Sequence, residues 1–296
     1  MTLYTQASAN VRKTWILLGS FLVFIIGLGW LFSYVLDNQL ILIFATVFSF
    51  AASFVSYWYS DKIVLAMTHA QEVDHAKNPG LYHLLENLCI AAGLPQPRFC
   101  LLEEAQPNAF ATGRDPQHAV IVVTRGLLEK LEKPELEGVL AHELSHIGNR
   151  DSLLMTGVVI LAGLVSNLSS FFFRMNWRRN SDDNNKAGAI LMVVALAAAI
   201  LAPLAALLIQ LAISRKREFL ADASGSLLTR YPEGLARALA KISLDPSALK
   251  VANPGTAHLY IVNPLRGKAA AGWLAGLFST HPPINDRIKA LREMSI

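Results

Sequence analysis

The chain of 296 residues is short of charge: Asp, Glu, Lys and Arg make up 16% of it, while 53% of its residues are hydrophobic. Soluble domains usually carry about 25% charged residues, so the deficit predicts contact with lipid. The formal net charge of +4 is too small to favour nucleic acid, and no basic face is interleaved with aromatic residues. We therefore expect no nucleic-acid partner, and a weak attraction to an anionic membrane surface.

Cysteine is scarce as well. The two cysteines, Cys89 and Cys100, do not form a CxxC pair. The sequence therefore gives no support to zinc binding through cysteine or to redox chemistry. We interpret both as ordinary buried thiols in a cytoplasmic part of the chain, where thiols stay reduced.

Long hydrophobic runs, by contrast, are plentiful. A helix needs about 20 apolar residues to cross the bilayer core, and four stretches reach that length: Trp15–Leu36, Leu40–Tyr59, Leu153–Phe173 and Ala187–Ile213. The first two carry no charge and are joined by three residues, so they predict a tight hairpin. The first is too long for a cleaved signal peptide and leads directly into a second span.

Basic residues orient this hairpin. Arg12 and Lys13 precede it, Lys62 follows it, and the turn between its helices has no Lys or Arg. The positive-inside rule then places both of its ends in the cytoplasm. Basic charge is balanced around the second pair, so that pair either crosses the membrane or forms a hairpin that only dips into it or packs on the protein; we favour crossing.

The polar segment Ser60–Asp151 predicts a folded α+β unit. Asn78 followed by a proline is a helix-start signal, and a second helix is expected from Pro134. The runs Arg98–Leu102 and Ala119–Thr124 are rich in strand-forming residues. Two further helices are expected later in the chain, at Pro232–Ile242 and Pro283–Met294.

The helix expected from Pro134 carries the motif H-E-x-x-H, from His142 to His146. Residues four apart lie on one face of a helix, so both imidazoles can reach one ion. Zinc suits neutral imidazole and often takes three protein ligands at a catalytic site. Glu143, next to the first histidine, could then take a proton from zinc-activated water as that water attacks a peptide carbonyl.

A third protein ligand must come from elsewhere, because no third histidine follows at short spacing. The best candidate is Glu218, which shares a helix face with Asp222. One carboxylate could bind zinc while the other accepts a hydrogen bond from a ligand imidazole. The alternative is that Glu218 merely pairs with nearby basic residues at a membrane boundary.

At these residues the chain resembles the HtpX group of membrane zinc peptidases, relatives of the CAAX prenyl endopeptidases. The resemblance covers nearly the whole chain and includes the N-terminal hairpin, the H-E-x-x-H helix and three further segments, Asn108–Gly113, Arg217–Asp222 and Ser279–Pro283. It implies that Glu218 is the third ligand and that each chain binds one Zn²⁺. It also implies a multi-pass protein of the cell inner membrane, with its catalytic domain facing the cytoplasm, that acts in quality control of misfolded membrane proteins and can cleave itself.

Two weaker site hypotheses concern substrate. The segment around Asn108, Ala109 and Phe110 could present a strand edge that pairs with an extended peptide, or it could be a simple hairpin turn. His281 could help to stabilise the oxyanion, with support from Arg287. The alternative for His281 is a structural role at a helix entry before two prolines.

The expected fold is thus mainly α with a small β element: multi-spanning membrane helices and an α+β zincin-like catalytic domain. We divide the chain into a transmembrane hairpin (1–60), a first catalytic part (61–152), a second membrane pair (153–213) and a second catalytic part (214–296). The expected activity is zinc-dependent endopeptidase. Two alternatives are a processing peptidase for lipid-modified C-termini and a non-catalytic metal-binding membrane protein; Glu143 argues against the latter, since metal binding alone does not need it.

Overall fold

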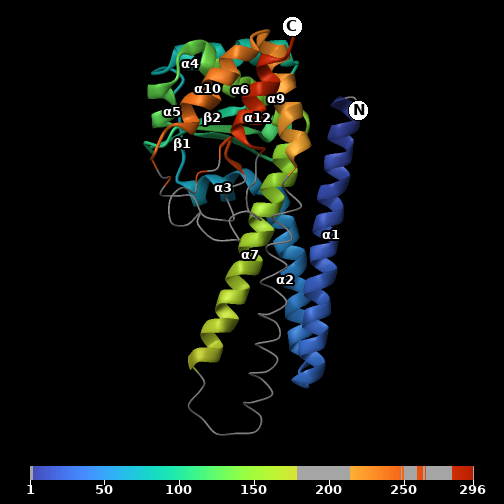
Figure 1. The fold of residues 1–296 in the computed structure, drawn as a ribbon. Coiled ribbons are helices and arrows are strands. Elements are labelled where there is room, and N and C mark those ends of the chain that lie inside the picture. The colour runs from blue at the N-terminus through green and yellow to red at the C-terminus, as the bar shows by residue number, and fades with distance from the viewer. Residues whose placement is uncertain are drawn as a thin grey trace.

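The structure, a computed structural model, describes residues 3–178, 214–247, 249, 259–262, 264 and 282–295. Long helices form a stalk, and shorter helices gather with a small sheet into a head at one end of it (Figure 1). The predicted second membrane segment of the later pair, Ala187–Ile213, lies outside the described residues, and so does His281.

Two stalk helices form the predicted N-terminal hairpin, α1 (Leu3–Val35) and α2 (Gln39–Trp58). Both are long and apolar enough to cross a membrane. Helix α1 begins well before Trp15, where the apolar stretch was predicted to start. Its 33 residues rise about 1.5 Å each and so exceed the bilayer core of about 30 Å. Its polar start therefore lies beside the head, where Gln6 and Asn10 are buried.

The third stalk helix, α7 (Asp151–Arg178), contains the third predicted apolar stretch. It follows α6 (Lys133–Gly148) after a sharp bend of 80°. Among the described residues, this bent pair counts as a third candidate span only when the two helices are taken together. The count of four spans therefore stays a prediction.

The sheet has four strands in the order β1-β2-β4-β3. Strands β2 and β4 run parallel, and the outer strands are antiparallel to their neighbours. The two predicted strands are present as β2 and β4, and the segment after Asn108 forms the edge strand β3. The bounds are β1 (Gln71–Glu72), β2 (Arg98–Leu102), β3 (Ala109–Thr112) and β4 (Val120–Thr124).

Strand β4 is buried on both faces, as its continuous apolar run requires. Ile121 and Val123 lie in a core formed with helices of the head. Val120 and Val122 face a second core that includes residues of α1 and α7. The sheet therefore joins the head to the stalk.

The other elements of the head are helices whose starts follow the sequence signals. Asn78 stands at the N-cap position of α4 ahead of Pro79, and Glu132 and Glu135 form a capping box at the start of α6. Helix α6 contacts β3, α4, α9 and α10, so it lies at the centre of the head. These helices are α3 (Ser60–Thr68), α4 (Pro79–Ala92), α5 (Arg125–Lys130), α9 (Arg215–Thr229), α10 (Pro232–Ser243) and α12 (Ile284–Arg292), with a short 3-10 turn η1 (Pro116–His118).

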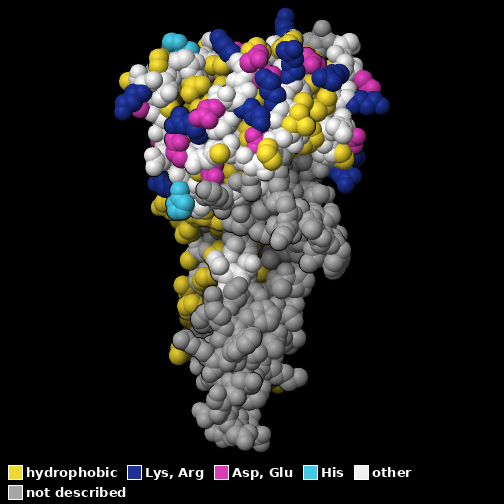
Figure 2. Space-filling view, turned by 60° about the vertical axis from the view of Figure 1, so that its left-hand side comes forward, with side chains coloured by type: hydrophobic (Ala, Val, Ile, Leu, Met, Phe, Trp, Pro, Cys, Tyr) yellow, Lys and Arg dark blue, Asp and Glu magenta, His cyan; other side chains and the backbone are white. Residues whose placement is uncertain are grey.

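The head and the stalk differ in the kinds of side chain on their surfaces. Charged side chains gather on the head, while apolar side chains follow the described part of the stalk (Figure 2). Large apolar residues of α1 and α2 are exposed along the whole hairpin, including Trp15, Trp30, Phe44 and Trp58. An apolar patch of this extent on a long helix pair is explained by lipid contact.

Candidate metal centre

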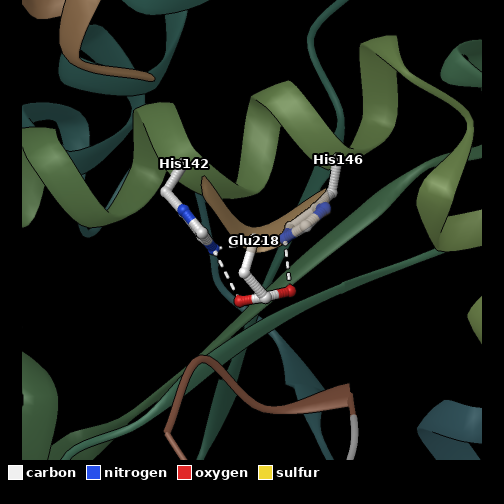
Figure 3. A group of neighbouring side chains, drawn as sticks. All are labelled: His142, His146 and Glu218. Atoms are coloured by element: carbon white, nitrogen blue, oxygen red, sulfur yellow. Dashed lines mark hydrogen bonds and ion pairs between the residues drawn. The ribbon is translucent and has the colours of Figure 1, made fainter. Parts of the chain in front are cut away.

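Three predicted ligands converge inside the head. His142 and His146 project from one face of α6, and Glu218 reaches them from the first turn of α9 (Figure 3). Their possible ligand atoms all lie within 4.8 Å of one another, and all three side chains are buried. Residues far apart in the sequence therefore meet at a single point.

The spacing of these atoms fits a single tetrahedral ion. The two Nε2 atoms of His142 and His146 are 3.1 Å apart. The Glu218 oxygens lie 3.9 Å from His142 Nε2 and 3.5 Å from His146 Nε2. Ligands at about 2.0–2.2 Å from a tetrahedral zinc are about 3.3–3.5 Å apart. Small side-chain movements would bring all three to that distance, and two imidazoles with one carboxylate suit Zn²⁺.

Glu143 lies beside this group and is also buried. Burial raises the pKa of its carboxyl group to about 7, although the His146 charge and a hydrogen bond from the Ala111 N–H oppose that shift. A bound cation would oppose it further, because positive charge favours the carboxylate. The surroundings thus move the pKa of Glu143 toward neutral pH, which is the range in which a general base works best.

Each of the two histidine rings has a carboxylate next to its Nδ1 atom. Asp222 Oδ1 lies 3.0 Å from His142 Nδ1, and Asp151 Oδ2 lies 3.1 Å from His146 Nδ1. Burial lowers the pKa of His142. Burial acts the same way on His146, but its hydrogen bond with Asp151 and the Glu218 charge outweigh this and raise its pKa to about 9. Carboxylates in this position orient a ligand imidazole and fix its tautomer.

Sequence reasoning pointed to Asp222 but missed Asp151. Asp151 is fully buried at the start of α7. One signal was available: a carboxylate five residues after His146, where a long apolar helix begins. An acidic residue in the first turn is common at any helix because of the helix dipole, so this signal is weak without the bend that turns Asp151 back toward α6.

Arg287 of α12 contacts two carboxylates of this group, those of Asp222 and Glu218. It is fully buried, and it donates from Nε and Nη2 to the two Asp222 oxygens at 2.8 and 2.7 Å. Its Nη1 donates to the Ile261 carbonyl at 2.9 Å and lies 3.5 Å from Glu218 Oε2. Burial raises the pKa of Asp222, but the guanidinium and the other contacts overcome this and lower it to about 2.

The comparisons with known proteins identify the family of this chain. The model of peptidase family M48 matches residues 75–295. This chain belongs to peptidase family M48. Proteins named Protease HtpX homolog are similar over nearly their whole length: one from Thermococcus sibiricus is 43% identical over 95% of this chain and 96% of its own, and one from Dictyoglomus thermophilum is 44% identical over 99% and 95%.

A crystal structure of Ste24p from S. mikatae has the same fold. Its TM-score is 0.51 and its identity 21%, over 95% of this chain and 67% of that chain. Membership in family M48 and the HtpX relatives confirm the resemblance predicted from the motifs. The protein is a metal-dependent endopeptidase of the membrane.

Within this M48 fold, the hypothesised substrate segment has a specific environment. Asn108, Ala109 and Phe110 are all buried. The Ala109 carbonyl accepts from the Ile261 N–H at 2.9 Å, and Asn108 Nδ2 donates to the Val262 carbonyl at 2.9 Å. Strand β3 is an edge strand, but its first residue is already paired with the segment around residue 261.

Arg287 also differs from its expected surroundings. It was considered as a support for an oxyanion beside His281, whose position lies outside the described residues. Its guanidinium instead lies behind the ligands, against Asp222 and Glu218. This placement favours a role in holding the predicted metal ligands.

Gly225 allows α9 to approach α6 closely. A β-carbon at Gly225 would lie 2.8 Å from the His142 backbone nitrogen and 3.0 Å from its Cα. We expect Gly225→Ala to push α9 away from α6 and so to separate Glu218 from the histidines. Overpacking costs about 1–3 kcal/mol, so zinc affinity, measured by chelator competition, should fall about tenfold or more.

The matched control is Gly80→Ala. Gly80 lies in α4, is exposed, and has nothing within 4 Å of an added β-carbon. Its substitution should leave zinc affinity unchanged and keep or slightly raise stability, because alanine suits a helix better than glycine. Equal zinc affinity in wild type and Gly225→Ala would show that the close contact does not position Glu218.

Proposed function

We propose that this M48 protein is a zinc-dependent endopeptidase in which His142, His146 and Glu218 bind one Zn²⁺ and Glu143 is the general base. One observation carries the proposal: two imidazoles and a carboxylate, buried and convergent, with a fourth side chain, the carboxyl group of Glu143, beside them. Metal binding alone does not need that fourth group, so the arrangement favours hydrolysis.

The roles of the residues follow from their contacts. A bound zinc ion supplies a Lewis acid that polarises a peptide carbonyl and makes water a better nucleophile. Glu143 accepts the proton of the attacking water at its carboxylate and can pass it to the leaving amine. Asp222 and Asp151 hold the two imidazoles with Nδ1 toward a carboxylate, which leaves Nε2 free to bind metal.

We further propose misfolded or membrane-derived polypeptides as substrates. The site lies where α6 turns into α7, close to the apolar stalk. A chain leaving the bilayer would therefore emerge on the side of the head that holds the site. The division into a hairpin (1–60), a split catalytic domain (61–152 and 214–296) and a second membrane pair (153–213) belongs to the same proposal.

Replacement of the third ligand tests the proposal. Purified wild-type protein in detergent should bind one zinc per chain and cleave unfolded casein. Glu218→Ala should lose both, because two imidazoles alone bind zinc weakly, whereas Lys216→Ala, an exposed change in the same helix turn, should keep both. Wild-type protein without bound metal would sink the proposal, and faster cleavage of a prenylated peptide than of casein would favour the processing-peptidase alternative.

Cysteine labelling tests the proposed cytoplasmic side. The native thiols Cys89 and Cys100 are buried, so background labelling should be low. A cysteine at Lys77, which is 80% exposed on the head, should react in inverted vesicles and stay protected in intact cells. A cysteine at Asn38, in the turn between α1 and α2, should show the reverse pattern. The same pattern at both positions would contradict the hairpin topology.

A further inference from the structure

Helix α1 carries one polar side chain that reaches the metal centre. Asn10 is fully buried, although it lies in a helix that is otherwise apolar over most of its length. It precedes the exposed apolar run that begins at Trp15, in the part of α1 that lies beside the head. An amide fully buried at such a place must be hydrogen-bonded to be tolerated.

The Asn10 amide donates to two acceptors near the end of α6. Its Nδ2 lies 2.6 Å from Asp151 Oδ1 and 2.9 Å from the Asn149 carbonyl. The other Asp151 oxygen, Oδ2, is the one that faces His146 Nδ1. A continuous chain of contacts thus runs from α1 through one carboxylate to a metal-binding imidazole.

We infer that Asn10 is a positioning residue of the metal centre, which fixes the Asp151 carboxylate against His146 and so makes metal affinity depend on the seating of membrane helix α1. The inference rests on the proposed metal site. A carboxylate held at both oxygens has one orientation, and this in turn holds the ring of His146 and its tautomer.

The space around this contact shows why the hydrogen bonds matter there. A cavity of about 430 Å³ opens beside Asn149, between Ala7 of α1 and residues of α4, α6 and α9. The polar start of α1 therefore borders open space on this side, while the apolar packing of α1 is with α2 and α7 further along the helix. Arg217 Nε is 3.7 Å from Asp151 Oδ1, which is beyond direct hydrogen-bond length. Asn10 therefore supplies the close donor to this oxygen.

The test uses Asn10→Leu in the full-length protein, with Thr14→Val as the control. Thr14 is buried one turn further along α1, and its hydroxyl donates to the Asn10 carbonyl within the helix. Outer partners of metal ligands contribute about 10–100-fold to affinity. We expect the zinc dissociation constant, from chelator competition, to rise about tenfold in Asn10→Leu and to stay within twofold in Thr14→Val. The visible spectrum of the Co²⁺-substituted protein should change in the first variant alone.

A double-mutant cycle separates positioning from general damage to the fold. In an Asp151→Asn background, Asn10→Leu should have no further effect on zinc affinity, because its route to His146 is already broken. Asn10→Asp, which keeps the size and sets a like charge against Asp151, should weaken zinc binding as well and serves if Asn10→Leu does not fold. Wild-type zinc affinity in these Asn10 variants, or effects that add fully to Asp151→Asn, would overturn the inference. Wild-type protein that binds no zinc would instead defeat the proposed function.

Discussion

Glu143→Gln is expected to lower peptidase turnover by about 10²–10⁴-fold while zinc binding stays at the wild-type level. Glutamine has the same shape and keeps an oxygen that can accept the hydrogen bond from the Ala111 N–H. It cannot take a proton from water, so the chemical step should fail while the fold survives. The measurement is kcat on unfolded casein, with zinc content determined on the same preparation.

The matched control is Glu137→Gln. Glu137 is half-buried in the same helix, five residues before the first predicted ligand, His142. Its substitution should leave both kcat and zinc content unchanged. Turnover by Glu143→Gln at the wild-type rate would remove Glu143 from the mechanism, whereas loss of zinc together with turnover would assign it to metal binding.

Arg287→Met is expected to be among the most destabilising single changes in the head. The substitution leaves the Asp222 carboxylate buried without its two closest donors. Breaking a buried ion pair by removing one partner costs about 3–5 kcal/mol. The apparent melting temperature in detergent should therefore fall by about 10 °C, and zinc affinity should fall with it, because Asp222 also holds His142.

Two variants make this prediction sharp. Arg292, one turn further along α12, makes a similar paired contact with Glu233 but is exposed, so Arg292→Met should change the melting temperature little. Adding Asp222→Asn to Arg287→Met should recover part of the lost stability, because no unpaired charge then remains. A melting temperature for Arg287→Met equal to that of Arg292→Met would contradict the structural importance of the buried pair.

The parts of the site that could be predicted are those encoded locally. His142 and His146 are four residues apart on one helix, and the helix itself carries an apolar face and a proline in its first turn. Glu218 could be predicted because Glu218 and Asp222 are four residues apart on α9, which repeats the spacing of the two histidines. Strand β4 could be predicted because its short run consists of β-branched residues, and strand β2 because its short apolar run follows the turn residues Gly93 and Pro95.

The parts that were missed depend on contacts between distant segments. Asn10 lies 139 positions from Asn149, and nothing in its neighbours marks it as part of a metal site. The early start of α1 was missed because apolarity locates the membrane-embedded part of a helix and not its polar extension. Strand β1 has two residues, Gln71 and Glu72, which are both polar, and it exists because the edge of β2 is available for pairing.

The place of Arg287 in α12 has a consequence for the order in which the protein matures. On the ribosome, the two histidines emerge first, then Glu218 and Asp222, and Arg287 long after them. Until α12 docks, Asp222 lacks its main counter-charge and the cradle for the cation is incomplete. A nascent chain would thus be a poor protease, which protects the translation machinery and the inserting chain itself from premature cleavage.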